Sequence, residues 1–236
     1  MIVNLKSIKH ISFDVWLTLI RSHHAFKPAR NQLFRTFFGI TESQAFVEET
    51  IIYFDRLCDE INQITGGQIE WKEMVLMILK HLKVDILEVD NAMLAAYYQE
   101  MELIFWKYPP VLVTDNLPNA LSIAKQKGFS LSLLSNTGFI EGATLRQYWE
   151  QKNLATYFDF QLYSDELHYS KPNAKVFESV LQAVLTSKQV EKHQILHVGD
   201  NRIADNNAAS DYGFTGFHIN DISSFLRELT LFCLNT

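Results

Sequence analysis

Residues 9–20 read KHISFDVWLTLI, and this stretch decides the fold. Its first half alternates weakly between polar and apolar residues and then runs into an apolar segment. That pattern is typical of a buried strand that ends in a loop. Asp14 lies near the carboxyl end of the predicted strand.

The second half of the chain alternates strands and helices. After Pro109-Pro110, the pattern predicts strands at 129–135, 158–164, 194–199 and 214–219, and helices at 118–127, 142–152, 173–185, 202–212 and 222–233. Such alternation predicts a parallel sheet with helices on both faces. The expected fold class is therefore α/β, with a doubly wound parallel sheet.

The region between these two parts has a helical pattern. Apolar residues recur at helical spacing in 31–38, 43–64, 71–82 and 85–106, with no strand between them. We therefore expect a core domain formed by residues 1–21 and 109–236. An all-helical cap domain of residues 22–108 is inserted after the first strand.

Composition and charge narrow the class of protein. The chain has 236 residues, 47% of them hydrophobic, and a formal net charge of −6. Without a run of basic residues we expect neither a nucleic acid nor a membrane as partner. No apolar stretch approaches the ~18 residues that cross a bilayer, and we see no secretory leader. We expect Cys58 and Cys233 to be reduced thiols and the protein to be cytoplasmic.

Polar residues suited to chemistry follow four of the predicted strands. Because ligand sites in open parallel sheets lie beyond the carboxyl ends of the strands, these residues are expected to meet at one edge of the sheet. They are Asp14, then Ser135 with Asn136, then Lys171, and finally Asp200 with Asp205.

In order and spacing these residues resemble the haloacid dehalogenase superfamily, and the match covers essentially the whole core. The helical insertion also lies where many members carry a helical cap. The resemblance implies that Asp14 is a covalent nucleophile. It implies that Ser135 and Asn136 hold a phosphoryl oxygen of the substrate, and that Lys171 offsets negative charge on nucleophile and substrate.

The resemblance also implies a magnesium ion. Magnesium prefers hard oxygen ligands, so Asp14, the backbone carbonyl of Trp16 and Asp200 are expected to share it. Asp205 binds through water or orients the site. The expected substrate is a small phosphorylated molecule.

Taken one at a time, these residues also have ordinary structural explanations. Asp200 and Asp205 could cap the helix that follows them. Ser135 and Asn136 could belong to a polar turn, and Lys171 could be a solvated lysine ahead of a helix. Only the complete set favours the catalytic interpretation.

The sequence departs from the superfamily pattern at Trp16. Phosphatases of the superfamily usually carry there a second Asp, which protonates the leaving oxygen and later activates water. An indole has one N–H donor and exchanges no proton at working pH. Losing a positioned general acid–base typically costs roughly 10²–10⁴-fold in rate. Leu17 replaces the usual Gly that follows.

Three functions remain open. The first is a phosphohydrolase whose substrates have a good leaving group or whose acid comes from elsewhere, for example from His23 or His24. The second is a metal-independent 2-haloacid dehalogenase, a class that resembles this chain in having an aromatic residue at position 16. The third is a binding or regulatory protein with little turnover. The sequence specifies neither the substrate nor the oligomeric state.

Overall fold

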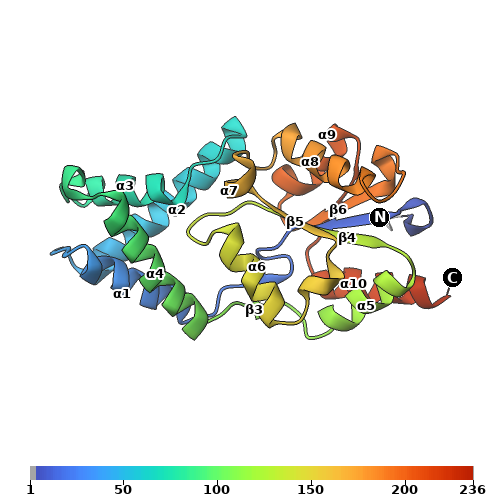
Figure 1. Cartoon of the computed structure of the whole chain (residues 1–236), viewed down its shortest axis with the longest axis horizontal. Helices are drawn as coiled ribbons and strands as arrows, with labels where there is room; N and C mark the ends of the chain where they lie inside the picture. The colour runs from blue at the N-terminus through green and yellow to red at the C-terminus, as the bar shows by residue number, and fades with distance from the viewer. Residues whose placement is uncertain (1–3, 236) are drawn as a thin grey trace.

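The computed structural model describes residues 4–235 and contains a central five-stranded parallel sheet. The strand order is β5-β4-β1-β6-β7, so the strand before Asp14 lies in the middle of the sheet (Figure 1). The strands are β1 His10–Phe13, β4 Ser130–Ser135, β5 Phe160–Tyr163, β6 Ile195–Gly199 and β7 Thr215–His218. The α/β fold with a doubly wound parallel sheet is thereby confirmed.

The central strand β1 is buried along its whole length and pairs on both sides. Phe13 lies opposite Leu133 of β4 and Val198 of β6. On the other face of β1 the ring nitrogens of His10 lie 2.8 Å from the hydroxyls of Ser130 and Ser132. Burial lowers the pKa of His10 to about 3, so the ring is neutral and its polar atoms are satisfied within the core.

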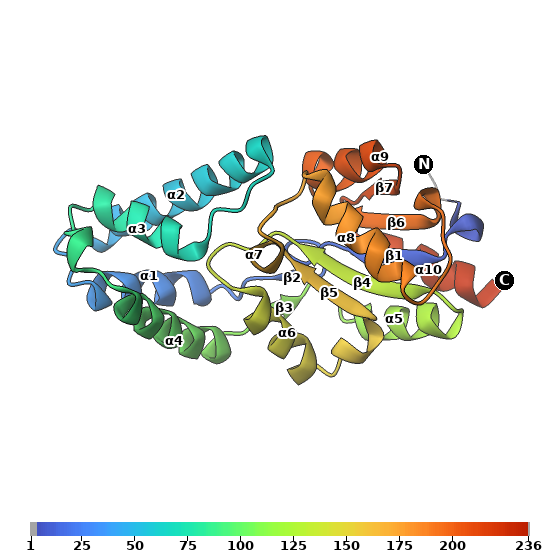
Figure 2. The same ribbon diagram turned by 45° about the horizontal axis from the view of Figure 1, so that its top comes forward.

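Helices cover both faces of the sheet. Helices α5 (Leu117–Gln126) and α10 (Ile222–Asn235) pack together on one face, and α8 (Ala174–Leu185) and α9 (Ala208–Tyr212) cover the other (Figures 1 and 2). Two further helices, α6 (Gly142–Gln151) and α7 (Ser164–Leu167), flank β5 in the sequence. Short 3-10 turns occupy Leu5–Ser7, Ala155–Tyr157 and Lys192–Gln194.

Four α-helices between β2 and β3 form a group beside the sheet (Figures 1 and 2). They are α1 Phe26–Phe37, α2 Gln44–Thr65, α3 Trp71–His81 and α4 Asn91–Lys107. The chain enters this group after β2 (Ile20–Arg21) and leaves it before β3 (Val111–Leu112), and the two strands pair antiparallel. The sequence pattern did not predict these two strands, because a two-residue strand has no periodicity.

Two predicted helices differ from the structure. The segment 85–106 contains a 3-10 turn (Ile86–Glu88) before α4, because Asp85 caps the turn at Leu87 N (3.0 Å) and Asp90 caps α4 at Met93 N (2.8 Å). The segment 202–212 begins with a π-helical turn (Arg202–Asn207), and α9 follows it. Such turns occur frequently at functional sites.

Within residues 4–235, no helix combines the length and the apolar character needed to cross a membrane. Cys58 and Cys233 are both free and buried.

Candidate active site

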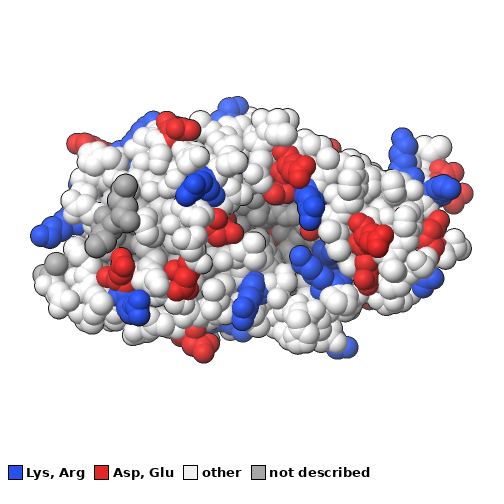
Figure 3. All heavy atoms as spheres, turned by 180° about the vertical axis from the view of Figure 1, so that it is seen from behind, with Lys and Arg blue, Asp and Glu red and all other residues white. Residues whose placement is uncertain are grey.

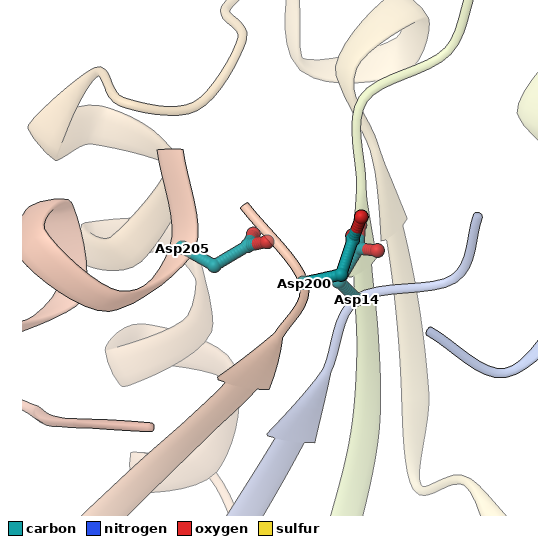
Figure 4. Close-up of side chains that lie close together, drawn as sticks. All are labelled: Asp14, Asp200 and Asp205. Carbon is teal, nitrogen blue, oxygen red and sulfur yellow. The ribbon is translucent and has the colours of Figure 1, made fainter. Parts of the chain in front are cut away.

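Asp14 lies just beyond the end of β1, at the centre of the sheet edge. Its backbone N–H donates to Val198 O (2.9 Å), which keeps the chain in register with β6 past the last strand residue. The residue is 6% exposed. Figure 4 shows its carboxylate beside that of Asp200, which follows β6, and Asp205 reaching toward both from the next helical turn.

Lys171 joins the nucleophile candidate to Asp205. Its ammonium donates to Asp14 Oδ1 (2.7 Å), Asp205 Oδ1 (2.6 Å) and the Leu134 carbonyl (3.1 Å), so each of its three protons has an acceptor. Burial would lower the pKa of Lys171, but the two carboxylates outweigh it and raise the pKa above its usual range. Lys171 therefore stays charged.

Asn136 holds the backbone of Lys171 in place. Its Oδ1 accepts from Lys171 N (2.8 Å) and its Nδ2 donates to Lys171 O (3.0 Å). The buried Ser135 hydroxyl donates to the Asn136 carbonyl (3.1 Å). The side chain of Asn136 thus positions Lys171, and a contact of the Ser135 hydroxyl or of the loop backbone with a phosphoryl oxygen stays a prediction.

Asp205 accepts hydrogen bonds on both oxygens. Oδ1 faces Lys171 and His197 Nε2 (3.2 Å), and Oδ2 accepts from Asn201 N (3.0 Å). Burial would raise the pKa of Asp205, but Lys171 and His197 hold it below its usual range. Its carboxylate is therefore committed to the protein, which fits an orienting role better than direct metal binding.

His197 is a site residue that the sequence reasoning missed. It is fully buried, and its Nδ1 lies 3.0 Å from the Ser12 hydroxyl while Nε2 faces Asp205. Burial lowers its pKa, so the ring is neutral. The alternation of side chains along β6 could have indicated it. His197 points to the same face of the sheet as Gly199, the residue at the end of the strand where the site lies.

Three carboxylates gather at this edge with only one ammonium. Asp14, Asp200 and Asp205 each offer an oxygen, and these oxygens all lie within 4.8 Å of one another. Burial raises the pKa of Asp14 to about 7 against the opposing effect of Lys171, and burial and Asp205 raise that of Asp200. A divalent cation would offset this excess negative charge.

The Trp16 carbonyl completes a donor set that magnesium prefers. None of residues 4–235 donates a hydrogen bond to it, whereas the Val15 carbonyl accepts from Leu19 N (2.9 Å) and Ile20 N (3.1 Å). Asp200 is half-buried, and among residues 4–235 its Oδ1 accepts a hydrogen bond only from Thr18 Oγ1, at a long 3.4 Å. Carboxylate and carbonyl oxygens of this kind are the donors that magnesium prefers.

Comparison with known families bears on these geometric findings directly. Residues 8–211 match the family of haloacid dehalogenase-like hydrolases. This chain belongs to that family.

Solved structures of similar fold include phosphatases and dehalogenases. A putative HAD-hydrolase of Bacillus subtilis bound to magnesium has a TM-score of 0.69 at 16% identity, covering 94% of this chain and 98% of that one. A HAD phosphatase of Thermococcus onnurineus has a TM-score of 0.64 at 19% identity (90% and 86% covered). A 2-haloacid dehalogenase of Pseudomonas syringae pv. tomato has a TM-score of 0.63 at 19% identity, covering 95% of this chain and 98% of that one. No curated protein matches this sequence.

The loop after Asp14 departs from the usual pattern of haloacid dehalogenase-like hydrolases. Leu17 has a φ of 62°, in the left-handed region that favours glycine, and its side chain is 67% exposed. Leu17 N donates to Ile20 O (2.7 Å), which closes the loop and leads into β2. Trp16 is half-buried and lines a cavity between the sheet edge and the helical group.

The two histidines considered as alternative acids lie elsewhere in the loop. His23 stacks on Tyr108 and His24, and its Nδ1 accepts from Ala25 N (3.1 Å). Neither histidine lines the cavities beside Trp16. The structure therefore places the four expected groups Asp14, Lys171, Asp200 and Asp205 together, and it brings neither His23 nor His24 to them.

Proposed function

We propose that this protein is a magnesium-dependent phosphohydrolase that acts through an aspartyl-phosphate on a small phosphorylated molecule with a good leaving group. The observation that carries the proposal is the group of three carboxylates around Lys171. An anionic substrate would be repelled by that group alone. With a cation held by these carboxylates, the group would accept a phosphoryl group.

Asp14 is the nucleophile in this proposal. A carboxylate oxygen of Asp14 attacks the phosphorus, a new P–O bond forms, and the bond from phosphorus to the leaving oxygen breaks. Lys171 orients the attacking carboxylate through its 2.7 Å hydrogen bond and offsets charge. Magnesium, held by Asp14, the Trp16 carbonyl and Asp200, would supply positive charge for the phosphoryl oxygens.

Trp16 restricts the leaving group. An indole gives no proton to the departing oxygen, so a group that leaves as a stable anion, such as a carboxylate or an aryloxide, is favoured. The aspartyl-phosphate is itself an acyl phosphate. Water therefore attacks the phosphorus of this intermediate, the bond from phosphorus to the Asp14 oxygen breaks, and Asp14 departs as a carboxylate. One proton of the water goes to phosphate or solvent.

A dehalogenase is the second candidate. Trp16 favours it, because halide leaves a carbon atom without needing a proton, and Asp14 would then form an ester with the substrate. The excess of carboxylates beside Lys171 argues against it, since an anionic haloacid gains nothing from them. A family member with little turnover, acting as a binding protein, is the third.

The deciding experiment measures phosphate release from a series of phosphate esters of falling leaving-group basicity, with magnesium and with EDTA. Asp14→Asn serves as the blank and is expected to lose turnover while it keeps the wild-type circular dichroism. We expect magnesium-dependent release that rises steeply as the leaving group improves.

Release in the Asp14→Asn variant equal to that of the wild type would remove Asp14 from its proposed role. No release from any ester would reject the phosphohydrolase. Chloride release from 2-haloacids in the same samples would then favour the dehalogenase, and its absence the binding protein.

A further inference from the structure

Arg30 is a buried cation that forms no ion pair within residues 4–235, although the charge of Asp55 acts on its pKa. It lies on α1 and is 4% exposed, and none of the carboxylates in residues 4–235 forms an ion pair with it. Nε and Nη2 donate to the neutral Asn31 Oδ1 (3.0 and 2.9 Å). Buried charges in proteins are normally paired, because taking a charge out of water without a partner is unfavourable.

The remaining donors of Arg30 face open space. Nη1 donates to none of the described residues. It is nevertheless not a fully buried atom that lacks a partner, since Arg30 lines a cavity of about 240 Å³. The Phe139 ring holds the guanidinium carbon 4.0 Å from its centroid. The guanidinium is therefore held by Asn31 and Phe139 at the wall of the cavity, and Nη1 keeps its donors for a further partner.

This cavity adjoins the reaction centre. Trp16 and Leu17, which follow the nucleophile candidate, line it, and they also line a second cavity of about 490 Å³ that reaches Asn136 and Thr137. Figure 3 shows a hollow between the two parts of the molecule, with basic and acidic side chains around its rim. A molecule whose phosphoryl group meets Asp14 could extend past Trp16 toward Arg30.

The walls of the cavity suit an anion on an apolar body. Lys27 lines both cavities one helical turn before Arg30, so two cations of α1 lie on the same side of the helix. Phe26, Phe139 and Ile140 supply apolar surface. Asp55 is the one acid among the residues that line the smaller cavity. Its charge opposes the lowering of the Arg30 pKa by burial, but the two side chains form no ion pair.

We propose that Arg30, with Lys27, binds a second oxyanion of the substrate, a carboxylate or a second phosphate on an aromatic or aliphatic scaffold. A guanidinium fork matches either group with two parallel hydrogen bonds. The inference rests on the proposed function, because it assigns the far end of the molecule whose phosphoryl group reacts with Asp14. Arg30 would thus be the specificity-determining residue of the cap.

The test compares three aryl phosphates with closely similar leaving phenols: 4-methylphenyl, 4-(carboxymethyl)phenyl and 4-(phosphonomethyl)phenyl phosphate. In the wild type we expect the anionic esters to have the higher kcat/KM, and the better of the two identifies the oxyanion. In Arg30→Met the preference for an anionic ester over the methyl ester should fall about 10- to 100-fold, because charged hydrogen bonds are lost.

Arg35→Met is the matched control. Arg35 lies on the same helix but lines neither cavity, and its Nε donates to Glu42 O (2.7 Å), so the ester preference should not change. Arg30→Lys keeps the charge without the fork, and its preference should lie between those of the wild type and Arg30→Met. It also serves if Arg30→Met does not fold.

Calorimetric binding of 4-hydroxyphenylacetate and of 4-hydroxybenzylphosphonate separates this inference from the proposed function. If no ester is hydrolysed but either product-like anion binds to the wild type and binds more weakly to Arg30→Lys, the phosphohydrolase fails and the anion site stands. If all three esters are hydrolysed without preference, or the preference survives in Arg30→Met, the anion site is wrong and the phosphohydrolase stands.

Discussion

Trp16 is the residue that most limits the chemistry of the site, because it stands where a proton-transferring carboxylate is needed. We expect Trp16→Asp to raise kcat/KM for an alkyl phosphate by roughly 10²–10⁴-fold, the usual contribution of a general acid–base. Steady-state phosphate release checks this. Trp16→Asn is the control, because Asn has the size of Asp but cannot exchange a proton. An equal gain in kcat/KM in Trp16→Asn would show that the wild type lacks space rather than a proton-transferring group.

Asp205 makes folding stability depend on pH. Burial raises its pKa, but Lys171 and His197 outweigh burial and keep the pKa below the ordinary value of about 3.9. Because the unfolded chain then binds this proton more readily, Asp205 stabilises the fold above about pH 4, and the stabilisation is lost as the pH falls through the lower folded pKa.

Thermal melts between pH 7 and 2.5 measure this effect. At pH 7 the wild type should have a higher Tm than Asp205→Asn, and this difference in Tm should shrink once the pH is below about 4. A difference that stays constant across the range would contradict the assignment. Asp211→Asn, an exposed substitution on α9, should show no such pH dependence.

At the scale of elements, the contact between the end of β6 and the π-helical turn is the tightest part of the site. A Cβ on Gly199 would lie 2.2 Å from Asp205 Cγ, so even a methyl group would displace the carboxylate from Lys171. We expect Gly199→Ala to destabilise the protein by roughly 1–3 kcal/mol through overpacking.

Urea denaturation gives the free energy of unfolding of Gly199→Ala. Gly67→Ala is the control, because a Cβ there would meet its nearest atom, Thr65 Oγ1, at an ordinary 3.4 Å, and its free energy should change little. Equal effects of the two substitutions would show that the close approach at Gly199 is not what matters.

At the scale of the whole molecule, two short strands carry the connection between the sheet and the helical group. Because β2 pairs with β3, the two chain segments that connect the sheet with the helical group lie side by side, next to the loop that bears Trp16. This arrangement supports, as a proposal, the division into a core of residues 1–21 and 109–236 and a cap of 22–108. The Bacillus subtilis structure is described as revealing interdomain movement in that protein.

Magnesium should stabilise the folded protein as a whole, because only the folded chain brings the carboxylates together. At 100 times Kd the gain is about 2.7 kcal/mol, which corresponds to roughly 5–10 °C in Tm for a chain of this length. Thermal melts with magnesium and with EDTA measure it. Asp200→Asn should lose the shift and Asp211→Asn should keep it, whereas an unchanged shift in Asp200→Asn would exclude Asp200 as a ligand.

Local pattern determined the order of the elements and the positions of the polar residues at the strand ends. Hydrophobic periodicity is a property of neighbours in the chain, so the alternation of strands and helices and the helical insertion were predictable. Because parallel strands end at one edge of a sheet, the proximity of Asp14, Lys171, Asp200 and Asp205 followed from topology.

Only the tertiary structure decided which partners those residues have. The bond of His197 to Asp205, the support of Lys171 by Asn136 and the pairing of β2 with β3 join segments distant in the chain, and no local period encodes them. Arg30 is the clearest case. In the sequence it is one basic residue on a predicted cap segment, and only packing against Phe139, with no carboxylate paired to it, turns it into a candidate binding residue.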